Sequence, residues 1–382
     1  MSKNMIKYYY LCNNCGICRQ ECTIFRTNLL ESLSPRTRVT VAGELYLNKM
    51  GITKKVIEAI FSCVLCGICE NACPSGASVL DVIKATRQYI IEHGEGPEAI
   101  SKLLDSIIQE KNIFLLENED RMSWAVDIED KIKDKINKKA EIALFVGCQE
   151  SFKGSLYNIP ESLVLIFEKA GLDFTLLGSE EWCCGAPYFL MGIKNGKLEE
   201  IVKHNIGKMK ELGVKKIITT CPGCYLAWKE QYKEIKEIEK DLPFEILHST
   251  EIIATLIKEG KLKIDKDYKK KVIFQDPCDL ARHSGVYDAP RVILENIPGL
   301  QLIKLEREKV DAYCCGGGGL CKAAYPDIAK TISKAVVNIY VDNGAEEIIT
   351  ACPACFDNLL NGIENIKNVN VVDIHNLIVN LI

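Results

Sequence analysis

The stretch GVKKIITTCPGC at residues 213–224 returns as GAEEIITACPAC at residues 344–355. In both stretches an apolar, strand-like run ends at a Cys-Pro-x-Cys pair. Upstream of each pair lies a Cys-Cys-Gly doublet, and before each doublet lies a lone cysteine. This shared register predicts two homologous subdomains in the C-terminal part of the chain.

Each of these two repeats carries five cysteines. They are Cys148, Cys183, Cys184, Cys221 and Cys224 in the first repeat, and Cys278, Cys314, Cys315, Cys352 and Cys355 in the second. An ordinary four-iron cluster or a structural zinc ion needs only four thiolates. Adjacent cysteines also point in diverging directions, which suits a cluster whose irons are spread apart. The pattern predicts an open, non-cubane cluster in each repeat, with zinc sites or disulfides as the alternative.

Short apolar runs in front of the cysteines predict parallel strands that alternate with helices. The runs are 142–146, 174–177 and 217–220 in the first repeat, and 272–274, 302–305 and 348–350 in the second. In parallel α/β units, ligands gather at the carboxyl ends of the strands. We therefore expect the five cysteines of each repeat to converge at one sheet edge. The two repeats should be related by pseudo-twofold symmetry, with a crevice between them.

Two runs of the form C-x2-C-x2-C-x3-C occupy the N-terminal part. With Pro74 after the second run, they match the two-cluster ferredoxin signature, in which the fourth cysteine of each run binds the other cluster. Two cubane [4Fe-4S] clusters are expected, one on Cys12, Cys15, Cys18 and Cys73 and the other on Cys63, Cys66, Cys69 and Cys22. Two zinc sites are the alternative. Gly16 and Gly67 permit tight backbone curvature, and Thr23, where the bacterial run has Pro, predicts a local change of turn only.

Helical periodicity covers three stretches beside the cysteine runs, at residues 40–61, 79–91 and 97–113. Residues 114–140 are charged and unpatterned, and we interpret them as a connection. The domain boundaries that follow are 1–93 for a ferredoxin domain, 94–140 for a helical linker, 141–262 for the first repeat and 263–382 for the second.

The overall composition limits the class of protein. Of 382 residues, 47% are hydrophobic and 26% charged, and no apolar run approaches the ~18 residues of a membrane span. The first residues lack the features of a signal peptide, so we expect a cytoplasmic location and metal ligands, not disulfides, among the 19 cysteines. A net charge of −4 argues against nucleic-acid binding. No dinucleotide fingerprint is present, so we expect neither flavin nor nicotinamide in this chain, and a separate electron-donor subunit.

Several motifs of the second repeat resemble those of a known family, the CCG-domain proteins that include the catalytic subunit of heterodisulfide reductase. They are Asp276-Pro277-Cys278, Pro290-Arg291, Ile297-Pro298-Gly299 and Cys314-Cys315-Gly316-Gly317-Gly318-Gly319. The chain is most similar to the D-type catalytic subunit, in which a ferredoxin and two CCG domains share one polypeptide. The resemblance implies an α+β multidomain fold, with an N-terminal α-helical ferredoxin domain followed by two homologous α/β CCG subdomains.

The resemblance also implies a function. In the family each complete five-cysteine set holds a non-cubane [4Fe-4S] cluster, and the two clusters face each other across the substrate, the mixed disulfide of coenzyme M and coenzyme B. Two cubane clusters relay electrons from a donor, which is a flavoprotein, a hydrogenase or dehydrogenase assembly, or a membrane cytochrome. Related chains are iron–sulfur subunits of glycolate, lactate and glycerol-3-phosphate oxidising enzymes. A non-catalytic electron conduit is therefore the alternative, and a zinc-bearing scaffold is a third possibility.

Three polar side chains near the second cysteine set are candidates for substrate contacts. His283 is a candidate proton donor or substrate contact. Arg282 and Arg291 have planar donor groups suited to an anionic substrate, and Arg291 is as well suited to a structural ion pair. Residues 316–319 lack the spacing and the lysine-serine pair of a phosphate loop, so we expect their backbone to pack against a cluster.

Two further histidines and one cysteine have no assigned place. His248 and His375 each follow a predicted strand and precede a predicted helix, which fits helix capping with burial or a proton-donor role. Cys321 belongs to neither five-membered set and is either a small buried side chain or a spare thiol near the substrate.

Overall fold

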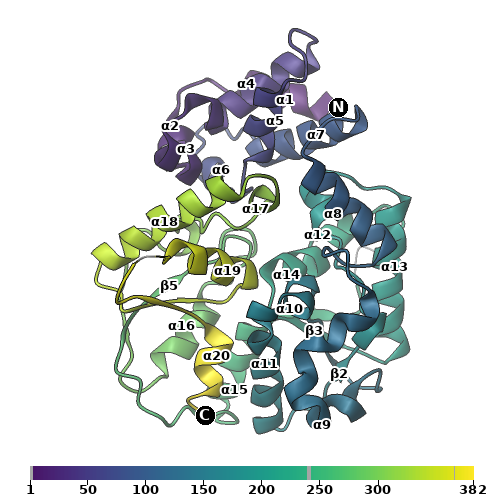
Figure 1. The fold of residues 1–382 in the computed structure, drawn as a ribbon, viewed down its shortest axis with the longest axis vertical. Helices are drawn as coiled ribbons and strands as arrows, with labels where there is room; N and C mark the ends of the chain where they lie inside the picture. The colour runs from purple at the N-terminus through teal and green to yellow at the C-terminus, as the bar shows by residue number, and fades with distance from the viewer. Residues whose placement is uncertain (1–2, 239–241, 365) are drawn as a thin grey trace.

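The computed structural model describes residues 3–238, 242–364 and 366–382. It has three parts, a helical N-terminal domain and two repeats that each contain a sheet (Figure 1). The N-terminal domain, purple to blue in Figure 1, lies across the top of the first repeat, in teal, and the second repeat, in green to yellow. The predicted α+β multidomain fold class is confirmed. Within the described part of the chain, no helix is both long and apolar enough to cross a membrane.

The N-terminal domain consists of short helices, with cysteines in the turns between them. They are α1 (Lys3–Leu11), α2 (Ile17–Glu21), α3 (Thr23–Asn28), η1 (Glu31–Leu33), α4 (Pro35–Tyr46), α5 (Lys54–Phe61), α6 (Ile68–Asn71) and α7 (Val79–Glu92). Gly16 and Gly67 precede α2 and α6 with φ of 81° and 79°, the curvature expected of them. The periodic stretch 40–61 is divided between α4 and α5, because Asn48 has a left-handed φ of 56° and the Thr53 side chain caps α5.

The segment after α7 is more ordered than the sequence predicts. It contains α8 (Glu98–Gln109), η2 (Asn118–Ile128), α9 (Glu129–Ile132) and η3 (Lys133–Lys135). Within η2, Arg121 and Trp124 are only 1% and 3% exposed. The stretch 114–140, interpreted as a connection, therefore packs into the protein, and its burial rests on single large side chains that produce no periodic pattern.

The first repeat is a four-stranded parallel sheet of order β2-β1-β3-β4. Its strands are β1 (Ile142–Leu144), β2 (Thr175–Leu176), β3 (Lys216–Thr219) and β4 (Glu245–His248). Its helices are α10 (Cys148–Phe152), η4 (Gly154–Leu156), α11 (Asn158–Lys169), η5 (Gly178–Glu180), α12 (Ala186–Leu190), α13 (Gly196–Glu211), α14 (Pro222–Lys229), η6 (Gln231–Glu234) and α15 (Ser249–Lys258). This order reverses between β1 and β3, and such a switch point opens a crevice at the carboxyl ends of the strands.

The second repeat has the same parallel order, β6-β5-β7-β8. Its strands are β5 (Lys271–Gln275), β6 (Gln301–Leu302), β7 (Glu347–Thr350) and β8 (Asn370–Asp373). Its helices are α16 (Asp288–Glu295), η7 (Lys309–Asp311), α17 (Cys321–Ala324), α18 (Pro326–Asp342), α19 (Pro353–Gly362) and α20 (Ile374–Val379). The equal strand order confirms that the two halves are homologous α/β subdomains.

The three parts make direct contacts at their junctions. Between the repeats, Ser162 of α11 donates a hydrogen bond to Asn376 of α20 at 2.9 Å. The Ser249 hydroxyl oxygen lies 2.7 Å from Nε2 of His375. In the glycine loop 316–319, a Cβ on Gly319 would lie 2.4 Å from the carbonyl carbon of Val64, which shows how closely that loop approaches the N-terminal domain. The N-terminal domain is therefore seated on the loop that follows the second Cys-Cys-Gly doublet.

Candidate functional site

In the structure the cysteines of the ferredoxin domain lie in two groups, one at the surface and one in the interior. We call Cys12, Cys15, Cys18 and Cys73 the outer set. Burial, together with the neighbouring thiols of the outer set, raises the pKa of Cys18 to about 11. Cys15 is exposed and the other three are half-buried. The outer set therefore lies at the surface of the N-terminal domain.

We call Cys22, Cys63, Cys66 and Cys69 the inner set. All four are buried, and all four line one cavity together with Arg38. Burial raises the pKa of Cys69, and the thiols of Cys63, Cys66 and Cys22 raise it further. Cys22 has thus left its own run and joined the other one.

In the first repeat, the cysteines lie in the segments that follow three of the strands, and Cys224 lies in the first turn of α14. Cys148 opens α10 after β1, the doublet follows β2, and Cys221 precedes α14 after β3. Hydrogen bonds from Cys183 and Cys224 lower the pKa of Cys184 to about 6. Gly147 approaches so closely that a Cβ there would lie 3.0 Å from the Cys224 sulfur. The five thiols of this repeat therefore converge at the switch point of the sheet.

The second repeat gathers its five thiols in the same way. The Cys315 thiol donates a hydrogen bond to the Cys355 sulfur at 3.0 Å. Contacts with Cys278 and Cys315 raise the pKa of Cys314, as does its burial. Cys352 caps α19 by accepting a hydrogen bond from the Cys355 backbone N–H. Both five-cysteine sets predicted from the sequence are therefore brought together.

The four sets fit iron–sulfur clusters by their donor chemistry. Each consists of thiols alone, and the ferredoxin sets have the four that a four-iron cluster takes. The cavity of the inner set opens onto all four of its sulfur-bearing residues. Among the described residues, no three His, Cys, Asp or Glu side chains are arranged for a single metal ion. A cluster on these residues would supply one-electron transfer.

The two five-cysteine sets face each other across the junction of the repeats. Cys221 and Cys278, one in each set, are half-buried, whereas the remaining eight are buried. Asp279, next to Cys278, has a carboxylate oxygen 3.9 Å from where a Cβ on Gly223 would lie. Burial raises the pKa of Asp279, and the His283 side chain 4.0 Å away opposes that effect. Each set therefore has one partly exposed cysteine residue, and Asp279 of the second repeat lies close to Gly223 of the first.

The inner set lies against the second repeat. The pKa of Cys66 is lowered to about 6. The main cause is a hydrogen bond with the Cys314 thiol. Arg282 donates to the carbonyl oxygen of Cys66 at 2.8 Å, and His283 Nε2 lies 3.0 Å from the carbonyl oxygen of Leu65. The sets are therefore arranged in the order outer, inner, second repeat, first repeat.

The polar candidates take up distinct positions. Arg282 also donates to the carbonyl oxygens of Val310 and Ala312, so it ties the inner-set loop to the loop before the second doublet. Its binding of a substrate anion stays a prediction. Arg291 forms a two-pronged ion pair with Asp276, with both distances 2.8 Å, and is also paired with Glu308. Of the two roles weighed for Arg291, the structure therefore shows the ion pair.

The two remaining histidines are fully buried. His248 caps α15 through Thr250, and His375 lies in the first turn of α20 with Nδ1 2.7 Å from Asp373. Burial and the neighbouring His375 lower the pKa of His248 to about 3. Cys321 is also completely buried, and burial raises its pKa to about 12. Each of the three residues therefore has a buried, structural environment, which was one of the two interpretations weighed for it.

Some residues around the sulfur sets were missed from the sequence. Arg121 forms a buried ion pair with Glu181 at 2.8 Å, and its other terminal nitrogen lies 3.7 Å from the Cys148 sulfur. Arg38 and Arg87 are buried beside the inner set. All three arginines lie in stretches with no motif. Only their contacts across the sequence reveal them.

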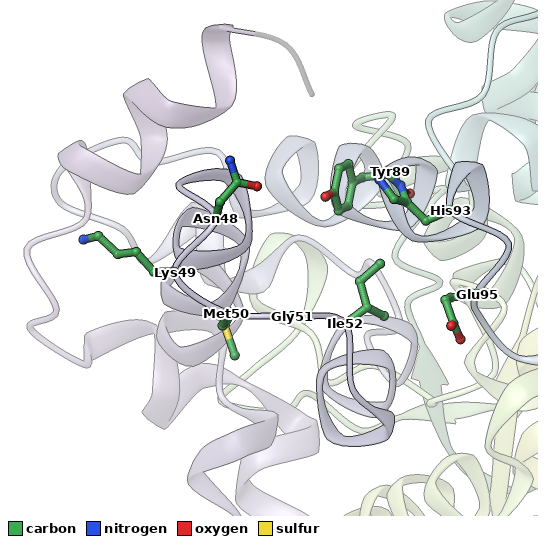
Figure 2. Close-up of a pocket in the computed structure, with 8 residues that line it drawn as sticks. All are labelled: Asn48, Lys49, Met50, Gly51, Ile52, Tyr89, His93 and Glu95. Atoms are coloured by element: carbon green, nitrogen blue, oxygen red, sulfur yellow. Dashed lines mark hydrogen bonds between the residues drawn. The ribbon is translucent and has the colours of Figure 1, made fainter.

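A wide depression on the N-terminal domain lies apart from these sets. It has a volume of about 660 Å³ and is lined by Asn48, Lys49, Met50, Gly51, Ile52, Tyr89, His93 and Glu95 (Figure 2). The rings of Tyr89, in α7, and of His93, which directly follows α7, lie 4.0 Å apart between their centroids. None of the predicted site residues lines it, so we assign it no part in the sulfur chemistry.

Comparisons with known proteins identify the domains of this chain and its relatives. A cysteine-rich domain model of the CCG family matches residues 142–229 and again 272–359, and a 4Fe-4S dicluster domain model matches residues 11–78. The D-type subunit of the dihydromethanophenazine:CoB–CoM heterodisulfide reductase of Methanosarcina acetivorans is 33% identical over 95% of this chain and 91% of the relative. The corresponding protein of Methanosarcina mazei is 32% identical with the same coverage.

One more distant relative and one solved structure carry other names. The EtfAB:quinone oxidoreductase of Syntrophomonas wolfei is 28% identical over 92% of this chain and 55% of the relative. A crystal structure of a hypothetical protein from Helicobacter pylori aligns with a TM-score of 0.47 and 12% identity, over 91% of this chain and 76% of that one. The matches at more than 30% identity span nearly the whole of both chains. The chain therefore belongs to the CCG-domain family of iron–sulfur proteins that includes the D-type subunits of heterodisulfide reductase.

Proposed function

We propose that this chain is the catalytic subunit of a heterodisulfide reductase-type complex in the cytoplasm. The substrate is a disulfide, the mixed disulfide of coenzyme M and coenzyme B, which takes up two electrons and two protons to give two thiols. The observation that carries this proposal is the pair of complete five-cysteine sets, each with one half-buried and four buried cysteines. The heterodisulfide reductase relatives support the choice of substrate.

In this proposal the ten cysteines of the repeats hold two non-cubane [4Fe-4S] clusters, and the eight of the outer and inner sets hold two cubane clusters. The repeats bind the disulfide between the half-buried Cys221 and Cys278 and exclude water from the remaining sulfur atoms. Asp279 and His283, whose side chains lie 4.0 Å apart beside Cys278, supply protons to the product sulfurs. Arg282 positions the inner-set loop against the second repeat.

An electron-donor subunit completes the proposed complex. The outer set is the entry point, because Cys15 is exposed while the inner set is buried. Tyr10 and Ile17, next to this set in the sequence, are apolar side chains with 69% and 47% exposure. A flavoprotein, a hydrogenase or dehydrogenase assembly, and a membrane cytochrome are all compatible with such a surface.

The test is an anaerobic assay of the purified, iron-loaded chain with a reduced viologen and the heterodisulfide. We expect disulfide-dependent oxidation of the viologen with release of two thiols for each disulfide. Cys315→Ser should abolish it, whereas the matched Cys321→Ala, which changes a cysteine outside every set, should retain it. Full iron loading with no disulfide-dependent oxidation would refute the catalytic function.

The second candidate is an electron-transfer subunit for a flavin-dependent dehydrogenase of glycolate, lactate or glycerol-3-phosphate. It is favoured by the similarity to the EtfAB:quinone oxidoreductase. On that function the chain would be reduced by its flavoprotein partner and would pass electrons to an acceptor other than a disulfide. The viologen assay separates the two functions, because an electron conduit has no disulfide-dependent turnover.

A further inference from the structure

Two arginines beside the inner set are buried and, in the part of the chain that the structure describes, have no carboxylate partner. Arg38 and Arg87 are 1% and 0% exposed. Arg38 donates to the Ala59 carbonyl oxygen at 2.6 Å and to the Ser62 hydroxyl at 3.2 Å. Among the described residues, neither guanidinium forms an ion pair with an aspartate or glutamate. Burying an unpaired cation costs several kcal/mol, so a negative charge nearby is expected to offset it.

Arg87 is placed where all three parts of the chain meet. Its terminal nitrogens donate to the carbonyl oxygens of Cys63 at 2.7 Å, Gly319 at 2.8 Å and Leu190 at 3.3 Å. These acceptors belong to the inner set, the second repeat and the first repeat respectively. Every one is a neutral carbonyl, so the hydrogen bonds orient the guanidinium but leave its charge uncompensated.

Thiols lie close to both arginines. Burial lowers the pKa of Arg87 to about 10, and the thiols of Cys63, in the inner set, and Cys321, outside it, oppose that effect. Arg38 lines the same cavity as the four inner-set cysteines. Burial alone would lower the pKa of Arg38, but Cys63, Cys22 and Cys69 as thiolates raise it. An arginine side chain does not lose its proton in proteins. Two fixed positive charges therefore lie beside a group that is anionic and becomes more so when it gains an electron.

The outer set has no such environment. Arg36 donates to the carbonyl oxygen of Asn14, between two outer-set cysteines, but it is also paired with Glu31 at 2.7 Å. Arg19 is paired with the same carboxylate at 3.0 Å. These arginine side chains are 30% and 34% exposed, so solvent screens them as well. The inner set therefore lies beside buried arginines, whereas the arginines beside the outer set are paired with a carboxylate and screened by solvent.

We propose that Arg38 and Arg87 are positioning residues that raise the reduction potential of the inner cubane cluster above that of the outer one. A single electron then moves from the outer site, which is oxidised, to the inner site, which is reduced, with no bond or proton exchanged. The fixed charges make that inward step favourable and hold the electron next to the second repeat. The inference rests on the cluster assignments of the proposed function but not on the identity of the substrate.

The test is a potentiometric titration of the anaerobically purified chain, followed by EPR, with Cys15→Ser identifying the outer signal. Removing one charge with Arg87→Gln or Arg38→Gln should lower the inner midpoint and leave the outer one unchanged. The ratio of reduced inner to reduced outer sites should fall about tenfold or more, from Coulomb's law for one charge at an effective dielectric constant near 20. The matched control Arg36→Gln, which removes a screened and paired charge, should leave the inner midpoint unchanged.

Lysine variants separate charge from structure. Arg87→Lys keeps the charge but not the fork of hydrogen bonds, so its inner midpoint should stay close to that of the unsubstituted chain. If the glutamine variants lose inner-site iron, Lys variants that restore both iron and midpoint support the proposal, and Lys variants that restore neither overturn it. An unchanged inner midpoint in iron-loaded glutamine variants, or an equal fall in Arg87→Lys, would also overturn it. The titration uses no disulfide, so its result is independent of the viologen assay.

Discussion

The contact between the glycine loop and the inner-set loop predicts a specific effect of Gly319→Ala. Gly319 has φ of +61°, and a Cβ there would lie 2.4 Å from the Val64 carbonyl carbon, whereas ordinary contact begins at 3.4 Å. A side chain in the left-handed region costs about 1–2 kcal/mol, and the forced separation adds about 1–3 kcal/mol. The free energy of unfolding should therefore fall by about 2–5 kcal/mol.

Gly344→Ala is the matched control, because Gly344 has φ of +87° and, among the residues the structure describes, no neighbouring atom lies within 4 Å of an added Cβ. It carries the backbone cost alone, so its loss should be about 1–2 kcal/mol. Both variants would be compared by anaerobic thermal unfolding and by the rate of viologen-to-disulfide electron flow, which only Gly319→Ala should slow. Equal stability losses and equal rates in the two variants would refute the close seating of the N-terminal domain on the second repeat.

Three more predictions concern the buried groups. Arg121→Met leaves Glu181 unpaired in the interior and should reduce the free energy of unfolding by about 3–5 kcal/mol. Lys138→Met, at an exposed ion pair, should change the free energy of unfolding by about 1 kcal/mol or less. Similar losses in the two variants would contradict the stabilising role of the buried pair. Burial holds the pKa of His248 at about 3, below its unfolded value of about 6.5, so stability should be greatest above pH ~6.5 and about 1.4 kcal/mol lower at pH ~5.5. His248→Gln should remove that part of the pH dependence in chemical unfolding, and an unchanged slope would count against it. Cys22→Ser should remove the EPR signal of the inner site and spare the outer one, while Cys321→Ala should keep all of the iron; loss of the outer signal would reverse the ligand pattern.

Much of the site followed from cysteine spacing, because thiolate clusters restrict their ligands to few arrangements. The crossing of Cys22 into the second run is fixed by a local motif, and the carboxyl-end position of Cys148 and Cys221 follows from the parallel strands before them. The apolar runs likewise predicted the strands, since a strand covered on both faces must be apolar throughout.

The contacts between the parts could not be predicted in the same way. Arg87 joins residues 103 and 232 positions away through hydrogen bonds to carbonyl oxygens, which leave no mark on the sequence. Arg121 lies in a charged stretch that resembles solvated surface, and only its partner Glu181 shows that it is buried. Arg282 was associated with substrate anions from its place beside the ligands, yet its donors meet three carbonyl oxygens of other segments. Such residues are recognised by what they touch.

The most direct measurement is a crystal structure of the anaerobically purified, iron-loaded chain with the disulfide bound. We expect an open four-iron cluster on Cys148, Cys183, Cys184, Cys221 and Cys224, a second on Cys278, Cys314, Cys315, Cys352 and Cys355, and one substrate sulfur at each. A cubane cluster or a zinc ion at either set, or two clusters too far apart to reach neighbouring sulfur atoms of the substrate, would contradict the proposed function.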